Sequence, residues 1–185
     1  MAIIDQLKRI GCISEYDERD IDDAQLAVIV GAASRAPSAA NAQPWEIVAV
    51  RAQERKVKLV HTLLDSHLRP RLGGDERRDW LAQAPVVLVV CLDHLRAKAR
   101  YGEVGEHLFG LQDTGAAIQN MRLVAVESGI KSCLVREFDH QQLAKLLELP
   151  GHVEPLIMIA LGYSSAEAAQ LPLLPLEDFF HQERW

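Results

Sequence analysis

The segment that constrains the fold most is the long helical pattern from Leu111 to Ser128. Small and apolar residues occur on most sides of this helix, at Gly115, Ala116, Ala117, Ile118, Met121, Leu123, Val124 and Ala125. A helix that is apolar on most sides is buried, either in a core or against another chain. Gly129 follows, and glycine is the usual residue of a left-handed helix cap. We therefore expect a buried helix that ends at Gly129.

Apolar runs and capping residues predict the other elements. The run from Ala84 to Leu92 is far shorter than the ~20 residues that a membrane helix needs, so it predicts a buried strand at Val86–Leu92. Further strands are predicted at Trp45–Val50, Ser132–Val135 and Leu156–Leu161. Helices are predicted at residues 2–9, 22–34, 53–66, 75–83 and 139–148, with a loop at 69–74 and mixed helix and loop at 92–110. The pairs Asp22/Gln25 and Asp139/Gln142 have the spacing of capping boxes.

Length, charge and cysteine content limit the class of protein. The 185 residues predict one domain, 1–185, and the net charge of −6 argues against a nucleic-acid partner. No basic cluster indicates binding to an anionic membrane, and no HExxH, GxSxG or phosphate-loop motif predicts a metal or nucleophile site. Cys12, Cys91 and Cys133 are odd in number and far apart, which favours reduced thiols in a cytoplasmic protein.

Residues 34–50, SRAPSAANAQPWEIVAV, place a run of small residues between a helix and a strand. Small side chains allow a flat ligand to approach the backbone closely. Asn41 and Gln43 are two residues apart, so in extended backbone both amides face one side. Each amide offers a donor and an acceptor, which suits the pyrimidine edge of a flavin. The alternative is that these amides bond to their own backbone, as polar loop residues usually do.

The stretch APSAANAQPW resembles the APSxxNxQPW segment of the FMN-dependent nitroreductase family. Further similar segments follow in the family's order: RYGEVG, LQDTGAAIQNMRLVAVESGIKSCLV, REFD, LPGHVEPLIMIALGY and LPLEDFFHQERW. The resemblance covers nearly the whole chain from about Leu7. It implies an α+β fold with a central, mostly antiparallel sheet surrounded by helices.

The resemblance also implies an intertwined homodimer with two FMN sites, and residues 111–128 at the interface. NAD(P)H would reduce FMN and leave, and a small-molecule acceptor such as a nitroaromatic or quinone would take the electrons at the same site. Because the flavin performs the redox chemistry, no catalytic acid–base pair is required. By the same match, Pro37, Ser38, Asn41 and Gln43 line the flavin ring and ribityl chain. The resemblance also implies that the backbone near Val135 and Arg136 would face the flavin.

The chain departs from the family where the FMN phosphate is held. Family members carry basic groups at positions that are here Ile10, Gly11, Ser14, Ala42, Leu173 and Leu174. A phosphate-binding serine corresponds to Cys12, and a glycine to Arg136. A shifted alignment would let Lys8 and Arg9 serve instead, so we include Arg9 and Ser14 among the expected cofactor-binding residues.

Three readings follow from these matches and departures. The first is an FMN-dependent oxidoreductase of the nitroreductase type. The second is a flavin-free or weakly flavin-binding member of the fold that binds a ligand or a partner. The third is an enzyme of the same fold that uses another small molecule or consumes reduced flavin. The apolar C-terminal tail, with Phe179, Phe180 and Trp185, is expected to dock on a second subunit.

Overall fold

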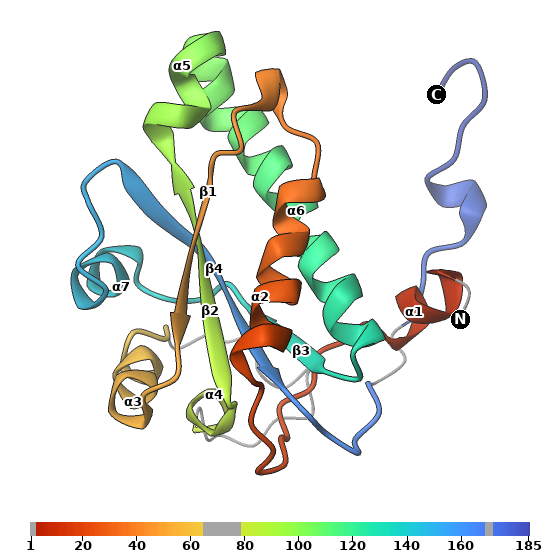
Figure 1. Cartoon of the computed structure of the whole chain (residues 1–185). Coiled ribbons are helices and arrows are strands. Elements are labelled where there is room, and N and C mark those ends of the chain that lie inside the picture. Colours follow the sequence, from red (N-terminus) through yellow and green to blue (C-terminus); the bar gives the residue numbers. More distant parts are fainter. Residues whose placement is uncertain (1–2, 65–78, 169–171) are drawn as a thin grey trace.

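An antiparallel sheet of four strands forms the centre of the computed structural model, which describes residues 3–64, 79–168 and 172–185 (Figure 1). The strands are β1 (Trp45–Val50), β2 (Val86–Asp93), β3 (Lys131–Val135) and β4 (Val153–Gly162). Their order is β1-β2-β4-β3, and every neighbouring pair is antiparallel. The predicted strands are all present, and the prediction of an α+β fold with an antiparallel sheet is confirmed.

Helices pack on both faces of this sheet (Figure 1). They are α1 (Ile3–Arg9), α2 (Asp23–Gly31), α3 (Gln53–His61), α4 (Trp80–Gln83), α5 (His94–Val104), α6 (Gly110–Glu127) and α7 (His140–Leu146). The 3-10 helical segments are η1 (Ala32–Arg35), η2 (Ala39–Asn41) and η5 (Leu176–Asp178), and η4 (Gly105–Phe109) is a π-helical turn between α5 and α6. The predicted mixture at 92–110 is helical after β2, with a kink at Gly102. The predicted loop 69–74 and the start of the helix 75–83 lie outside the described residues.

The central strand β2 supplies both cores of the molecule. Val86, Leu88 and Val90 point to the face covered by α2 and α6, where Ile29 and Met121 pack against them. The intervening Val87, Val89 and Cys91 point to the opposite face, against Leu59, Phe138 and Leu143 from α3, the segment before α7 and α7. Successive side chains of a strand alternate between faces, so a strand covered on both faces must be apolar throughout. This explains the unbroken apolar run in the sequence.

The long helix α6 is buried on the side that faces the sheet. Thr114, Ala117, Met121 and Ala125 lie at helical spacing and are almost fully buried. Leu111, in contrast, is 47% exposed on the outer side. The predicted C-terminal cap is confirmed, because Gly129 has a φ of +75°, and Ile130 N–H donates to the Ala125 carbonyl at 2.8 Å.

The two predicted capping boxes differ in outcome. Asp22 and Gln25 form a complete box at the start of α2. At α7, the Asp139 carboxylate accepts from the Gln142 backbone N–H at 2.9 Å, but the Gln142 side chain bonds to that carboxylate instead of the backbone. The reason is that the Asp139 N–H already donates to the Thr62 carbonyl at 2.8 Å. The second prediction is therefore wrong in its reciprocal half.

Both ends of the described chain carry exposed apolar side chains. In α1 they are Ile3, Ile4 and Leu7, and in the C-terminal segment they are Leu173, Leu174, Leu176, Phe179, Phe180 and Trp185. Figure 1 shows the C-terminal segment away from the sheet. Among the described residues, no helix combines the length and hydrophobicity needed to cross a bilayer.

Gly162 at the end of β4 gives a stability prediction. A Cβ at this position would lie 2.6 Å from Tyr16 Cδ1 and 2.7 Å from Pro85 Cδ. The Tyr16 ring cannot swing away freely, because its hydroxyl donates to the Ile13 carbonyl at 2.6 Å. We expect Gly162→Ala to lower the free energy of unfolding by about 1–3 kcal/mol, through overpacking. Gly151→Ala is the control for urea unfolding, because nothing lies within 4 Å of its Cβ position; equal stability of the two variants would contradict the prediction.

Candidate functional site

The segment between η1 and β1 has an unusual backbone conformation. Ala40, Asn41 and Gln43 have φ angles of 51°, 56° and 46°, in the left-handed region that residues other than glycine rarely adopt. Such positions cost on the order of 1–3 kcal/mol each and persist where surrounding contacts fix them. The prediction that Asn41 and Gln43 lie in extended backbone is therefore wrong.

The two amides nevertheless meet. Gln43 Nε2 donates to Asn41 Oδ1 at 3.3 Å, and the Gln43 backbone N–H donates to Ser38 Oγ at 3.0 Å. The alternative that both amide side chains bond to their own backbone does not describe this arrangement. The left-handed turn therefore brings together the two amides that the sequence predicted to face one side.

Arg96, near the start of α5, holds the end of this segment. Its Nη1 donates to the Gln43 carbonyl at 2.9 Å, and its Nη2 donates to the Trp45 carbonyl at 3.2 Å. The same guanidinium bonds to Asp93 Oδ2 at 2.8 Å through Nε and forms an ion pair with Glu46. Burial raises the pKa of Asp93, but the hydrogen bonds and charge of Arg96 outweigh it and hold that pKa below its usual value.

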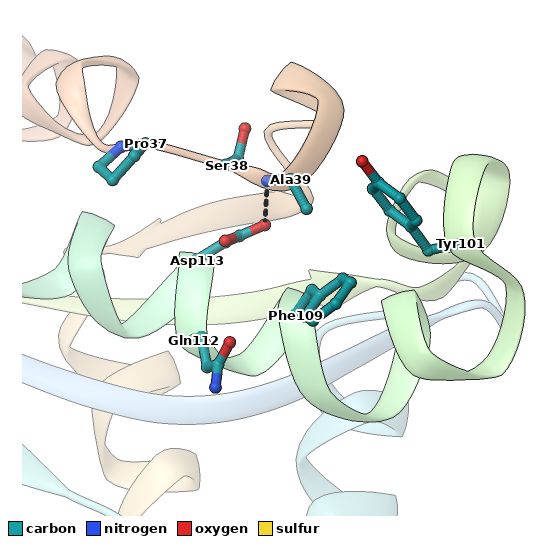
Figure 2. Close-up of a pocket in the computed structure, with 7 residues that line it drawn as sticks. All are labelled: Pro37, Ser38, Ala39, Tyr101, Phe109, Gln112 and Asp113. Atoms are coloured by element: carbon teal, nitrogen blue, oxygen red, sulfur yellow. Dashed lines mark hydrogen bonds between the residues drawn. The ribbon is translucent and has the colours of Figure 1, made fainter.

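An open pocket of about 380 Å³ lies between this segment and the α5–α6 region (Figure 2). Its lining residues are Pro37, Ser38, Ala39, Tyr101, Phe109, Gln112 and Asp113. The rings of Tyr101 and Phe109 meet edge to face, with centroids 5.3 Å apart. The Asp113 carboxylate accepts a hydrogen bond of 2.9 Å from the Ala39 backbone N–H. The pocket therefore has one aromatic wall and one wall of small residues anchored by Asp113.

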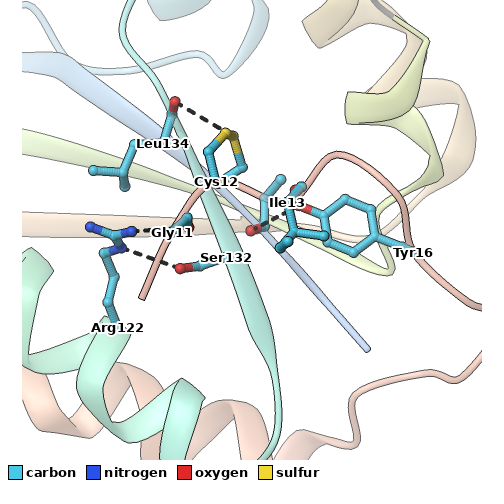
Figure 3. Close-up of a disulfide and its surroundings, with 9 residues drawn as sticks. Gly11, Cys12, Ile13, Tyr16, Arg122, Ser132 and Leu134 are labelled. Atoms are coloured by element: carbon cyan, nitrogen blue, oxygen red, sulfur yellow. Dashed lines mark hydrogen bonds between the residues drawn. A yellow bond between two sulfur atoms is a disulfide. The ribbon is translucent and has the colours of Figure 1, made fainter. Parts of the chain in front are cut away.

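A second group of contacts joins the N-terminal stretch to β3 and α6 (Figure 3). Arg122 of α6 donates to the Gly11 carbonyl and to Ser132 Oγ, both at 3.2 Å. Cys12 and Cys133 form a disulfide across the same contact. The prediction of reduced thiols is therefore wrong for these two residues, because folding brings together cysteines that are 121 positions apart.

Arg122 is the functional candidate that sequence reasoning missed, because it lies in a helix whose pattern is otherwise apolar. It is half-buried, and within the described ranges its hydrogen-bond acceptors are the neutral oxygens of Gly11 and Ser132. Of the five N–H donors of a guanidinium, two are used in these bonds. Burial lowers the pKa of Arg122, and the positive charge of Arg136 lowers it further. A half-buried cation beside a second cation is an arrangement that favours an anion.

The remaining predicted residues belong to the two stretches of chain that this second group joins, the N-terminal stretch and the end of β3. Val135 is the last residue of β3 and is half-buried, and Arg136 follows it and is exposed. Arg9 is the exposed last residue of α1, and Ser14 is exposed in the following stretch.

In one chain, the predicted residues therefore fall into two groups. One is the segment 37–43, anchored by Asp113 near the start of α6, and the other surrounds Arg122. Asp113 and Arg122 are nine positions apart, which corresponds to about 14 Å along a helix.

The cysteines give a direct test of this region. We expect peptide mapping without reductant to recover Cys12 linked to Cys133. Cys91 should resist alkylation in the folded protein, because it is buried and burial raises the pKa of its thiol to about 12. Reduction should lower the free energy of unfolding by about 2–5 kcal/mol, since the bond closes a long loop. Three free thiols in unreduced, unfolded protein would contradict the pairing.

Related proteins were found by comparing the sequence with family profiles and with curated proteins. The Nitroreductase family profile matches residues 11–163. An FMN reductase [NAD(P)H] of Bacillus subtilis (strain 168) is 30% identical over 186 residues, which cover 94% of this chain and 70% of the relative. A putative NADH dehydrogenase/NAD(P)H nitroreductase of Archaeoglobus fulgidus is 29% identical, with 94% and 92% covered.

Solved structures have the same fold. A nitroreductase family protein from Streptococcus pneumoniae TIGR4 superposes with a TM-score of 0.84 at 20% identity, covering 98% of this chain and 100% of the other. The hypothetical oxidoreductase YcnD from Bacillus subtilis gives a TM-score of 0.83 at 29% identity, covering 100% of this chain and 75% of the other. With the profile match over most of the chain, these similarities confirm the resemblance read from the sequence: the chain belongs to the nitroreductase family.

Proposed function

We propose that this protein is an FMN-dependent NAD(P)H oxidoreductase that reduces flat acceptors such as nitroaromatics or quinones by a ping-pong mechanism. The observation that carries the proposal is the segment 37–43, which turns two amides together beside an aromatic-walled pocket in a chain of this family. Relatives named FMN reductase [NAD(P)H] and oxygen-insensitive NADPH nitroreductase support the same class of reaction.

The amides of Asn41 and Gln43 are suited to the pyrimidine edge of the flavin. One donor–acceptor pair links them to each other at 3.3 Å, and amide groups keep further hydrogen-bonding capacity for a ligand. Pro37 and Ser38 lie at the edge of the pocket, where small side chains allow close approach to a ring. Bound FMN would accept hydride from NAD(P)H and deliver electrons to the acceptor. The part of the chain is to hold and orient these molecules.

The phosphate end of FMN has a cation available despite the missing family residues. Arg122 presents a half-buried guanidinium with unused donors, and Arg136 adds a second positive charge nearby. Guanidinium groups bind phosphate oxygens through paired hydrogen bonds. We assign the phosphate to Arg122, with Val135 and Arg136 at the adjoining end of β3 and with Arg9 and Ser14 on the N-terminal side.

Tyr101 and Phe109 form the acceptor-binding wall in this proposal. Aromatic side chains favour flat aromatic partners through offset or edge-to-face contacts. The pocket of about 380 Å³ is within the usual range for small-molecule sites.

A homodimer completes the proposed site. In one chain the amide segment contacts Asp113 in the first turn of α6, and Arg122 lies nine positions further along that helix; a ligand between two chains would reach both types of group. Exposed apolar residues in α1 and in the C-terminal segment supply a surface that a second subunit would cover.

The visible absorption spectrum of freshly purified protein tests the proposal, before and after FMN addition and desalting. We expect a retained flavin band that NAD(P)H bleaches and that returns when an acceptor is added. Protein that stays colourless after incubation with FMN would contradict the proposal and favour the flavin-free reading.

Two substitutions test the assignment of ring and phosphate. Asn41→Ala should weaken the binding of FMN and of riboflavin alike, by about 2–10-fold, through loss of a neutral hydrogen bond.

Arg122→Gln should weaken the binding of FMN by about ten- to a hundredfold and leave the binding of riboflavin unchanged, because riboflavin has no phosphate. Fluorescence titration of both ligands gives the ratio of affinities. An unchanged ratio for Arg122→Gln would show that another residue holds the phosphate.

A further inference from the structure

The segment 38–44 comprises the strained residues and Pro44, which leads into β1. Its strained backbone requires contacts from outside the segment. Three residues other than glycine have left-handed φ angles within four positions. Within the segment, Asn41 N–H donates to the Ser38 carbonyl at 2.9 Å and Ala42 N–H donates to the Ala39 carbonyl at 3.1 Å. These short-range bonds close turns, but they leave the segment free to move as a unit relative to the sheet and helices.

Arg96 fixes one end of the segment. It binds the carbonyls of Gln43 and Trp45, which flank the entry into β1, and it is itself oriented by Asp93. The Asp93 backbone N–H donates to the Pro44 carbonyl at 2.7 Å, so the junction is held at three consecutive carbonyls. A lysine ammonium has all its donors on one atom and cannot span the same set of acceptors.

Asp113 fixes the other end through the Ala39 N–H (Figure 2). Arg96 belongs to α5 and Asp113 to α6, and the same region carries Tyr101 and Phe109 of the pocket wall. The two anchors therefore set the position of the segment relative to the aromatic wall.

We propose that Arg96 is a positioning residue that, with Asp113 as second anchor, pre-organises segment 38–44 for its ligand. This inference rests on the proposed function for the identity of that ligand, FMN. A segment already held in the binding conformation loses less conformational freedom when the ligand binds, so affinity is higher. Arg96 acts through the backbone of Gln43 and needs no contact with the ligand.

The experiment compares Arg96→Lys with Arg51→Lys in the full-length protein. Arg51 is a matched control, because it also binds a backbone carbonyl, that of Ile21, and two carboxylates, Asp20 and Asp23, but at the opposite end of β1. Hydrogen exchange of the ligand-free protein should be about tenfold faster at amides 39–43 in Arg96→Lys and unchanged there in Arg51→Lys. FMN affinity should fall about tenfold in Arg96→Lys alone, and the absorption band of its bound flavin should shift toward that of free FMN.

Each outcome bears on a defined claim. Unchanged exchange at 39–43 in Arg96→Lys would overturn the inference, whether or not the parent protein binds FMN. Faster exchange with parental FMN affinity would also overturn it, because the segment would then be held without consequence for the ligand. A parent protein that binds no FMN defeats the proposed function, while the exchange comparison still decides whether Arg96 positions the segment. Should Arg96→Lys not fold, Asp93→Asn, which weakens the contact that orients Arg96, must produce faster exchange at amides 41–43 for the inference to stand.

Discussion

Burial of β2 on both faces is the constraint on which the rest of the structure depends. Its side chains alternate between the core under α2 and α6 and the core under α3 and α7. Because α6 packs on one of these cores, the residues along it acquire fixed positions. Asp113 then meets the segment before β1, and Arg122 meets the stretch before α2. The packing of α6 against β2 thus positions both groups of candidate residues.

The two groups differ in physical character. The segment 38–44 is neutral, conformationally strained and held at its backbone by charged side chains. The region around Arg122 is cationic, partly buried and cross-linked by a disulfide. A ligand with a flat hydrogen-bonding ring and an anionic end would satisfy both. The cytoplasmic location stays a prediction, and the disulfide removes one of its supports, since such bonds are uncommon in that compartment.

Local patterns predicted those parts of the molecule that local forces control. The apolar run before Asp93 predicted β2, Gly129 predicted a helix end, and Asp22 with Gln25 predicted a complete capping box. The reciprocal half of the Asp139 box failed because a distant carbonyl, that of Thr62, competes for the same N–H. The extended conformation predicted for Asn41 and Gln43 failed because Arg96 and Asp113, more than 50 positions away, fix another one.

The sequence by itself determined the antiparallel α+β fold, the membership of the nitroreductase family and the composition of the amide segment. Periodicity, capping residues and the order of motifs can all be read along the chain without knowledge of its packing. Tertiary structure decided which side chains stabilise and complete the candidate site. Arg96, Arg122 and the Cys12–Cys133 pair are ordinary residues in their own surroundings along the chain. Their importance arises from contacts across α5, α6 and the edge of the sheet, which exist only after the two cores have packed.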